Sequence, residues 1–174
     1  MGYFLVIGYE LYILTDYIHL PAGMRPAQGV TVVAAIGAVG ALLAAAVAGP
    51  LSDRLNRRKP FVFASSAVAG AGCVLPVLSP TFTSVEVYAA FAGLAFGTYL
   101  SVDAALVTLV LPRSEDAARD LGVLNIANAG PQVLAPLFAA LIIGHLGGYR
   151  MLFILGGCCG VAGAIAVLPV RAVR

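Results

Sequence analysis

The chain has 174 residues, of which 61% are hydrophobic and only 10% are charged, and its mean hydropathy is +0.99. A soluble domain carries about a quarter of its residues as charged side chains, and a core of this size cannot hide so many apolar residues. The composition therefore excludes a soluble globular protein, and the small net charge of +2 argues against a nucleic-acid partner. We expect an all-α, polytopic membrane protein in contact with the lipid bilayer.

Six apolar segments approach the length of about 20 residues that a bilayer crossing requires. Proline or glycine marks the breaks between most of them, as at Pro21, Pro60, Pro80, Pro112 and Gly147. The sequence predicts a single domain, residues 1–174, with six transmembrane helices. These helices cover about 2–20, 29–51, 61–79, 84–111, 120–144 and 149–170.

A dense charge cluster separates the second and third predicted helices. Residues 53–59 hold five of the eighteen charged side chains of the chain, and four of the five are basic. Loops rich in lysine and arginine stay on the cytoplasmic side of a membrane. Eight of the ten basic residues fall in the second loop, the fourth loop and the C-terminal tail, whereas Arg25 and Arg150 fall on the other side. This distribution predicts a protein of the cell membrane with both termini in the cytoplasm.

The charge cluster also carries a recognisable motif. Residues 49–59 read Gly-Pro-Leu-Ser-Asp-Arg-Leu-Asn-Arg-Arg-Lys, and the pattern Gly-x-x-x-Asp-Arg-x-x-Arg-Arg-Lys resembles the loop signature of major facilitator superfamily transporters. Residues 147–153, Gly-Gly-Tyr-Arg-Met-Leu-Phe, are similar to the start of the final helix of such a transporter. Residues 119–125, followed by Pro131 and Gln132, resemble the penultimate helix of sucrose–proton and related sugar–cation symporters.

The resemblance covers nearly the whole chain and implies the C-terminal six-helix half of a twelve-helix carrier. Such a carrier is a secondary active transporter that works by alternating access. The resemblance implies a small solute as substrate, such as a sugar or a drug. Coupling to protons is a hypothesis that rests on Glu10 and Asp103.

The resemblance also implies a conformational latch. In the superfamily, the aspartate and arginine of the motif hold the cytoplasmic side closed until the carrier turns inward. The chain departs mildly from the pattern because Asn56 stands where glycine is common, and asparagine also tolerates a left-handed turn. The competing interpretation is that the basic residues only orient the helices, which leaves Asp53 unexplained. The latch residues implied here are Gly49, Asp53, Arg54, Arg57 and Arg58.

The chain supplies one half of a fold whose substrate cavity lies between two halves. We therefore expect a truncated or split carrier, paired with a complementary N-terminal half or with a second copy. The alternative is a six-helix fragment that does not transport and acts as an assembly partner in a larger membrane complex.

Ionisable residues inside a membrane are costly and are functional candidates by default. Glu10, near the middle of the first helix, is the better candidate for the substrate or proton pathway, because Asp16 reaches the interface. Asp103 lies in the fourth helix, with Tyr99 one turn earlier and Tyr88 on nearly the same face. This carboxylate either binds substrate hydroxyls or the coupling proton, or forms a structural ion pair with a loop arginine.

Three amides lie within one stripe of the fifth predicted helix: Asn125, Asn128 and Gln132. In an apolar helix each of them needs a hydrogen-bonding partner. They either line a polar pathway or bond to neighbouring helices.

Small residues recur every four positions at Gly40, Ala44 and Ala48, and again at Gly156 and Gly160. Such stripes let helix backbones approach closely in lipid. We interpret them as helix-packing faces, and a dimer face is the alternative.

The sequence predicts neither an enzyme nor a cofactor site. It shows no phosphate-binding glycine loop and no nucleophile elbow. No His, Cys and acidic residues cluster at metal-ligand spacing, and the three cysteines lie in apolar runs as packing residues.

Overall fold

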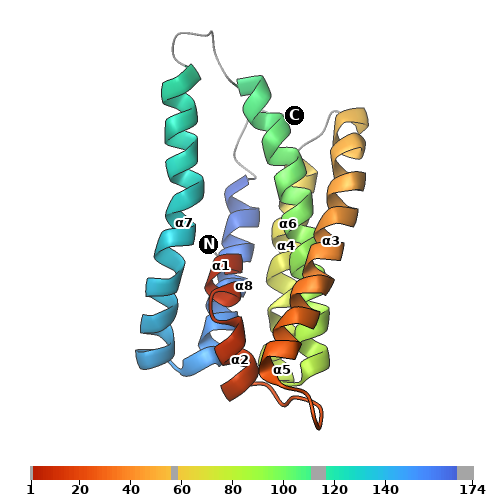
Figure 1. Ribbon diagram of the computed structural model, residues 1–174. Helices are drawn as coiled ribbons and strands as arrows, with labels where there is room; N and C mark the ends of the chain where they lie inside the picture. Colours follow the sequence, from red (N-terminus) through yellow and green to blue (C-terminus); the bar gives the residue numbers. More distant parts are fainter. Residues whose placement is uncertain (1, 56–58, 111–116, 168–174) are drawn as a thin grey trace.

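The computed structural model describes residues 2–55, 59–110 and 117–167, and within these ranges it leaves out the side chains of residues 59, 103–110, 117–121, 124 and 128. Every regular element in the described residues is a helix (Figure 1), which confirms the all-α prediction for this part of the chain. The helices are α1 (Gly2–Ile7), α2 (Glu10–Asp16), α3 (Pro26–Leu55), α4 (Lys59–Gly72), α5 (Val74–Leu78), α6 (Phe82–Val110), α7 (Ala117–His145) and α8 (Gly148–Val167).

Five helices in the described residues are long and apolar enough to cross a membrane. They are Pro26–Leu55, Pro60–Leu78, Phe82–Val102, Asn125–His145 and Gly148–Val167. The predicted count of six is not confirmed, because the first predicted segment, about 2–20, is divided between the short helices α1 and α2.

The break between α1 and α2 lies at Gly8 and Tyr9. The Gly8 N–H is 3.4 Å from the Phe4 carbonyl oxygen, and the Tyr9 N–H bonds to Val6, only three residues back. Glycine lowers helix stability at such a point. As a result, α2 restarts at Glu10 and places this carboxylate in its first turn.

Two prolines shape the other helices in different ways. Pro76 has no N–H for the carbonyl of Gly72, and the third predicted segment accordingly divides at Cys73 into α4 and α5. Pro50 is absorbed within α3, which runs on to Leu55 instead of ending near residue 51. Asp53 and Arg54 therefore lie in the last turn of a helix and not in a loop.

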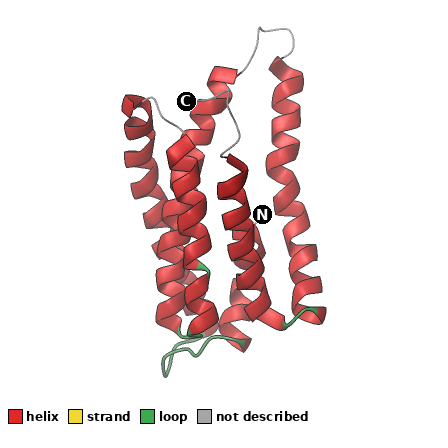
Figure 2. Cartoon of the chain, turned by 180° about the vertical axis from the view of Figure 1, so that it is seen from behind, coloured by secondary structure: helices red, strands yellow, loops and turns green. Residues whose placement is uncertain are grey.

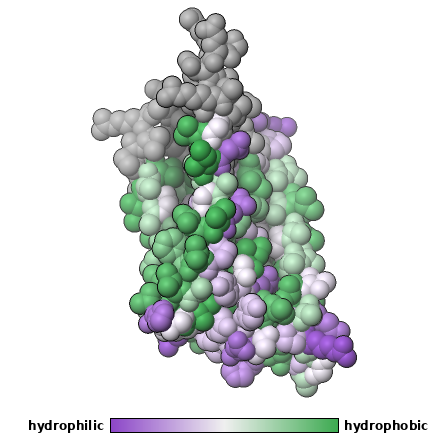
Figure 3. Space-filling view, turned by 60° about the vertical axis from the view of Figure 1, so that its left-hand side comes forward, coloured by the Kyte–Doolittle hydropathy of each residue, from purple (hydrophilic) through white to green (hydrophobic). Residues whose placement is uncertain are grey.

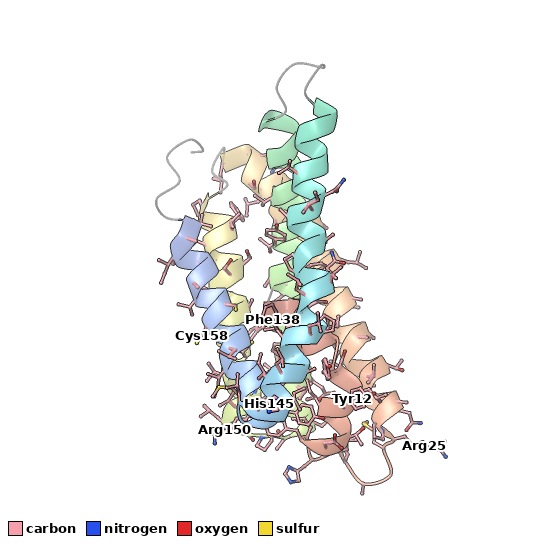
Figure 4. The ribbon with its side chains drawn as sticks, turned by 90° about the vertical axis from the view of Figure 1, so that its left-hand side faces the viewer. Tyr12, Arg25, Phe138, His145, Arg150 and Cys158 are labelled. Atoms are coloured by element: carbon pink, nitrogen blue, oxygen red, sulfur yellow. The ribbon has the colours of Figure 1, made fainter. Side chains whose placement is uncertain are left out.

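The helices alternate between two ends of the bundle (Figure 1). We call the end where α3 stops and α4 starts the basic end, because Arg54, a member of the charge cluster, lies there in the last turn of α3. The opposite end holds residues 17–25, 79–81 and 146–147, where the described loops gather (Figure 2). Arg25, His145 and Arg150 are all seen at this opposite end in Figure 4.

The surface of the bundle is rich in apolar side chains. The face in Figure 3 is largely green along the helices, with hydrophilic residues gathered at its lower end. Large side chains such as Leu42 (72%), Ile126 (73%) and Val133 (70%) are mostly exposed. Such a surface fits a protein whose solvent is lipid.

The backbones of α3 and α6 are in direct contact through glycines. A Cβ atom on Gly93 would collide with the Gly37 carbonyl oxygen, and one on Gly97 would collide with the Ala41 carbonyl oxygen. A Cβ on Gly40 would lie 3.2 Å from the carbonyl oxygen of Ala90. The stripe that begins at Gly40 therefore packs against α6, as the helix-packing interpretation expects.

A second glycine contact joins α4 to α8. A Cβ on Gly160 would lie 2.9 Å from the backbone nitrogen of Gly70, and Gly157 also faces the Gly70 carbonyl oxygen at 3.3 Å. Close backbone approach is the main way in which helices associate where lipid removes the hydrophobic drive. The two glycine contacts fix two helix pairs, and the remaining helices pack around them.

The buried core centres on Phe153 of α8, which is 0% exposed. Its ring meets the edge of Tyr88 at a centroid distance of 5.5 Å and lies 6.3 Å from the ring of Tyr17. Ile13 and Leu14 of α2 are also fully buried in this cluster. The core thus joins α2, α6 and α8.

Polar contacts close the opposite end of the bundle. The Tyr17 hydroxyl donates to the Pro76 carbonyl oxygen at 2.9 Å, and Pro80, four residues after Pro76, has no N–H to fill that role. The His19 N–H donates to the Pro80 carbonyl oxygen at 3.0 Å. The Tyr149 hydroxyl donates to Asp16 Oδ2 at 2.9 Å. These bonds tie the end of α2 to α5 and to α8.

We expect Gly97→Ala to lower the free energy of unfolding by about 1–3 kcal/mol, the usual cost of overpacking. The added methyl group meets a backbone carbonyl of α3, which cannot move aside as a side chain can. Gly130→Ala is the matched control, because a Cβ there meets nothing within 4 Å of the described atoms. Unfolding in detergent–SDS mixtures measures both variants, and an equal loss in the two would contradict the contact.

We expect Tyr17→Phe to destabilise the protein by about 0.6 kcal/mol, with an upper limit of about 1.7, which is the range for hydrogen bonds between membrane helices. The substitution removes only the donor to Pro76 and leaves the ring in place. Tyr12→Phe is the control, because Tyr12 is 57% exposed on the same helix. The same SDS titration separates the two variants. A loss for Tyr12→Phe as large as that for Tyr17→Phe would exclude a specific role for this bond.

Candidate functional site

A partly open cavity of about 480 Å³ lies among the helices and is lined by residues of α1, α4, α6, α7 and α8. Its walls are aromatic rings and small residues, and none of its described lining residues is charged. The aromatic and polar members of the lining are Tyr3, Phe4, Ser65, Ser66, Tyr88, Phe96, Tyr99 and Gln132.

An aromatic cluster forms one wall and joins α1 to α6. Tyr3 and Phe96 are stacked, with ring centroids 4.7 Å apart and planes inclined by 10°. The Phe4 ring packs edge-to-face (T-shaped) with both of these rings. The cluster gives the cavity flat apolar surfaces beside phenol groups, a combination that suits a ring-shaped solute.

Serines supply part of the polar lining. Ser65 and Ser66 of α4 both face the cavity, and the Ser65 hydroxyl donates to the Val62 carbonyl oxygen at 2.9 Å. Neither these serines nor Tyr3 are among the site residues predicted from the sequence. The sequence feature that could have indicated the serines is the pair of adjacent hydroxyl residues in an otherwise apolar helix.

Of the predicted pathway residues, Tyr99 and Gln132 line this cavity, together with Tyr88. They come from α6 and α7, so the structure brings together side chains that are distant in sequence. Asn125 is exposed on α7 and does not line the cavity. The side chains of Asp103 and Asn128 lie outside the described residues, although their backbones belong to α6 and α7.

Glu10 lies beside the cavity but is not part of its lining. Its Oε1 atom is buried and has no hydrogen-bond partner among the described residues. Tyr3 and Tyr88, which do line the cavity, are near enough to Glu10 to interact with it electrostatically. Burying a carboxylate oxygen without a donor is costly, so packing alone does not account for this residue.

Of the predicted latch residues, Gly49 lies where α3 meets α6. Gly49 faces Ser101, with 3.7 Å between an ideal Cβ on the glycine and the serine Cβ. Asp53 and Arg54 are exposed on the last turn of α3. Arg57 and Arg58 lie outside the described residues. This geometry places Gly49 against the helix that carries Tyr99 and Asp103, and the latch itself stays a prediction.

A search for metal ligands finds no group of three or more His, Cys, Asp or Glu residues that could hold an ion within the described ranges. Cys73 and Cys159 border the cavity from α4–α5 and α8, and both are free thiols.

Comparison with known proteins places the chain in one family. The model of the Major Facilitator Superfamily matches residues 1–174, which is the whole chain. No curated protein matches the sequence, and the narrower likeness to sucrose–proton symporters stays a prediction. Members of the matched family are membrane transporters, in agreement with the apolar helices described above. The chain belongs to the Major Facilitator Superfamily.

Proposed function

We propose that the chain forms the C-terminal half of a secondary active transporter that moves a small solute by alternating access. The observation that carries this proposal is the cavity between α1, α4, α6, α7 and α8, found in a chain that matches the superfamily from end to end. Carriers of this kind bind their solute near the middle of the membrane and rock two halves around it.

The lining of the cavity supports an uncharged solute with a ring. The stacked pair of Tyr3 and Phe96 offers a flat surface, and Tyr99, Ser66 and Gln132 carry groups that bond to hydroxyls or amides. A sugar suits both features, and a planar drug-like molecule suits the first.

Glu10 is our first candidate for proton coupling. It lies at the helix break, beside the phenols that line the cavity, and its buried oxygen has no hydrogen-bond partner among the described residues. A proton that binds and leaves there would change the charge next to the solute. Asp103 is the second candidate, from its position in α6.

We propose that Asp53 and Arg54 bias the basic end toward its closed state. They extend from α3 where Gly49 meets α6, so a movement between these two helices would shift them directly. The distribution of lysine and arginine supports a cytoplasmic location for this end, in a protein of the cell membrane. Arg57 and Arg58 follow in sequence as further members of the latch.

The partner we propose is a complementary N-terminal half, with a second copy as the alternative. Two halves of this fold enclose the solute pathway between them. The helix α7 presents exposed Asn125 and Gln132 beside exposed Ile126 and Val133, a mixture that suits a protein partner better than lipid alone.

One observation favours a second function, that of a membrane-embedded fragment without transport of its own. The helices α1 and α2 have 6 and 7 residues, and a bilayer crossing takes about 20. In that case the chain would act as an assembly partner within a larger membrane complex.

We expect proton-driven uptake in liposomes that contain the chain, alone or with its complementary half. Radiolabelled glucose and sucrose serve as probes, with the outside at pH 5.5 and the inside at pH 7.5. Glu10→Gln should abolish the dependence of uptake on the pH gradient, because the amide cannot exchange a proton. Asp16→Asn is the control, since Asp16 is exposed at the opposite end and bonded to Tyr149.

Two results would contradict this scheme. A gradient dependence that persists in both Glu10→Gln and Asp103→Asn would exclude these carboxylates as the coupling sites. Uptake no greater than in protein-free liposomes, with the complementary half present, would favour the non-transporting fragment.

A further inference from the structure

A second hollow lies on the outside of the bundle, where α3, α4 and α6 meet, and we call it the lateral groove. Its volume is about 440 Å³. Alanines make up the small residues of its lining, and leucine, valine and phenylalanine make up the larger ones. Its lining includes Leu43, Ala44, Val47, Ala48, Leu51, Phe61 and Ala64.

The lateral groove opens toward the lipid. Leu43, Val47 and Leu51 are 61%, 63% and 42% exposed, whereas Ala44 and Ala48 between them are buried. Buried alanines flanked by large exposed side chains form a furrow along α3. Among the described residues that line it, only Ser65 and Thr98 have polar side chains, so the furrow suits a hydrocarbon chain.

The lateral groove reaches the basic end of the bundle. Leu51, in its lining, is three residues before Arg54, which is exposed. Phe61, also in its lining, follows closely after the charge cluster in sequence. Residues 53–59 contain four basic side chains and one acidic side chain. Basic clusters next to membrane helices attract anionic lipid headgroups.

We propose that an anionic phospholipid occupies this site, with an acyl chain in the lateral groove and its phosphate at Arg54. The apolar furrow and the positive charge are continuous along α3, and this lipid class matches both at once. The inference is independent of the transport function proposed above.

Charge argues against a second copy of the chain as the occupant. Two copies related by an axis along the membrane normal would place their basic ends on the same side of the membrane. Because residues 53–59 of each copy hold three more basic than acidic side chains, bringing these ends together would cost electrostatic free energy. A lipid phosphate has the opposite charge.

The test compares phosphatidylglycerol with phosphatidylcholine, each added to the full chain in an uncharged detergent. Native mass spectrometry measures the lipid that stays bound, and thermal unfolding measures the rise in Tm that each lipid gives. We expect phosphatidylglycerol to bind and to raise Tm more than phosphatidylcholine does.

Two variants examine the two parts of the site. Arg54→Gln removes the charge on an exposed side chain, and Ala64→Leu fills the lateral groove from an exposed position on α4. Each should reduce bound phosphatidylglycerol at least five-fold. Their controls are Arg150→Gln, an exposed arginine at the opposite end, and Val133→Leu, which is 70% exposed on α7. Both controls should bind phosphatidylglycerol as the unchanged protein does.

Three results would overturn the proposal. The first is equal binding of the two lipids, or binding that Arg54→Gln leaves unchanged. The second is a Tm rise of the same size with inorganic phosphate alone, which would show a simple anion at Arg54. The third is a dimer that Ala64→Leu converts to a monomer while phosphatidylglycerol has no effect, which would assign the lateral groove to a second copy.

Discussion

The contact between α3 and α6 is made by backbone atoms, and it sets the positions of most functional candidates. Gly93 and Gly97 leave no room for a side chain opposite the carbonyls of Gly37 and Ala41. Lipid offers no hydrophobic gain for pairing helices, so close approach and dispersion contacts must hold them. The same contact brings Gly49 to Ser101 and fixes α6, the helix that carries Tyr99 and Phe96 into the cavity.

Two tyrosine hydroxyls link the irregular N-terminal segment of this bundle to backbone carbonyls of neighbouring helices. Backbone polar groups at membrane depth must find partners within the protein. Tyr9, at the break between α1 and α2, donates its hydroxyl to the Pro136 carbonyl oxygen of α7 at 3.3 Å. The Tyr17 hydroxyl likewise donates to the Pro76 carbonyl oxygen of α5 at 2.9 Å. The two breaks are thereby tied to neighbouring helices, and the first of them presents Glu10 next to the cavity.

The sequence predicted the class of fold well because composition alone decides it. Long apolar runs in a chain with few charges have no stable alternative to membrane helices. The charge cluster and its motif also pointed to the family that the comparison confirms. The positions of the small residues Gly40 and Gly160 correctly indicated packing faces, because a missing side chain has few other uses there.

The remaining features depend on contacts that one-dimensional patterns do not contain. Helices that are apolar on all sides show no periodicity, so the sequence did not reveal which faces enclose the cavity. The apolar pattern predicted one helix over residues 2–20. Whether Gly8 interrupts a helix depends on its tertiary surroundings, so the break there was not predicted. The sequence predicted that the second helix ends near Pro50. In the structure α3 continues through Pro50 to Leu55, despite the backbone hydrogen bond that the proline cannot make. The role of Ser65 and Ser66 in lining the cavity depends on the positions of α1, α6 and α8, which the sequence pattern does not contain.

Ser65 and Ala95 each line both the inner cavity and the lateral groove. The partition between the two compartments is therefore one residue thick at these positions, and both of these residues are small. A larger side chain at either position would take volume from both compartments at once. Mutational scans of the groove lining should therefore find two sites whose effects spread into the interior, while neighbours such as Val47 affect the lipid side alone.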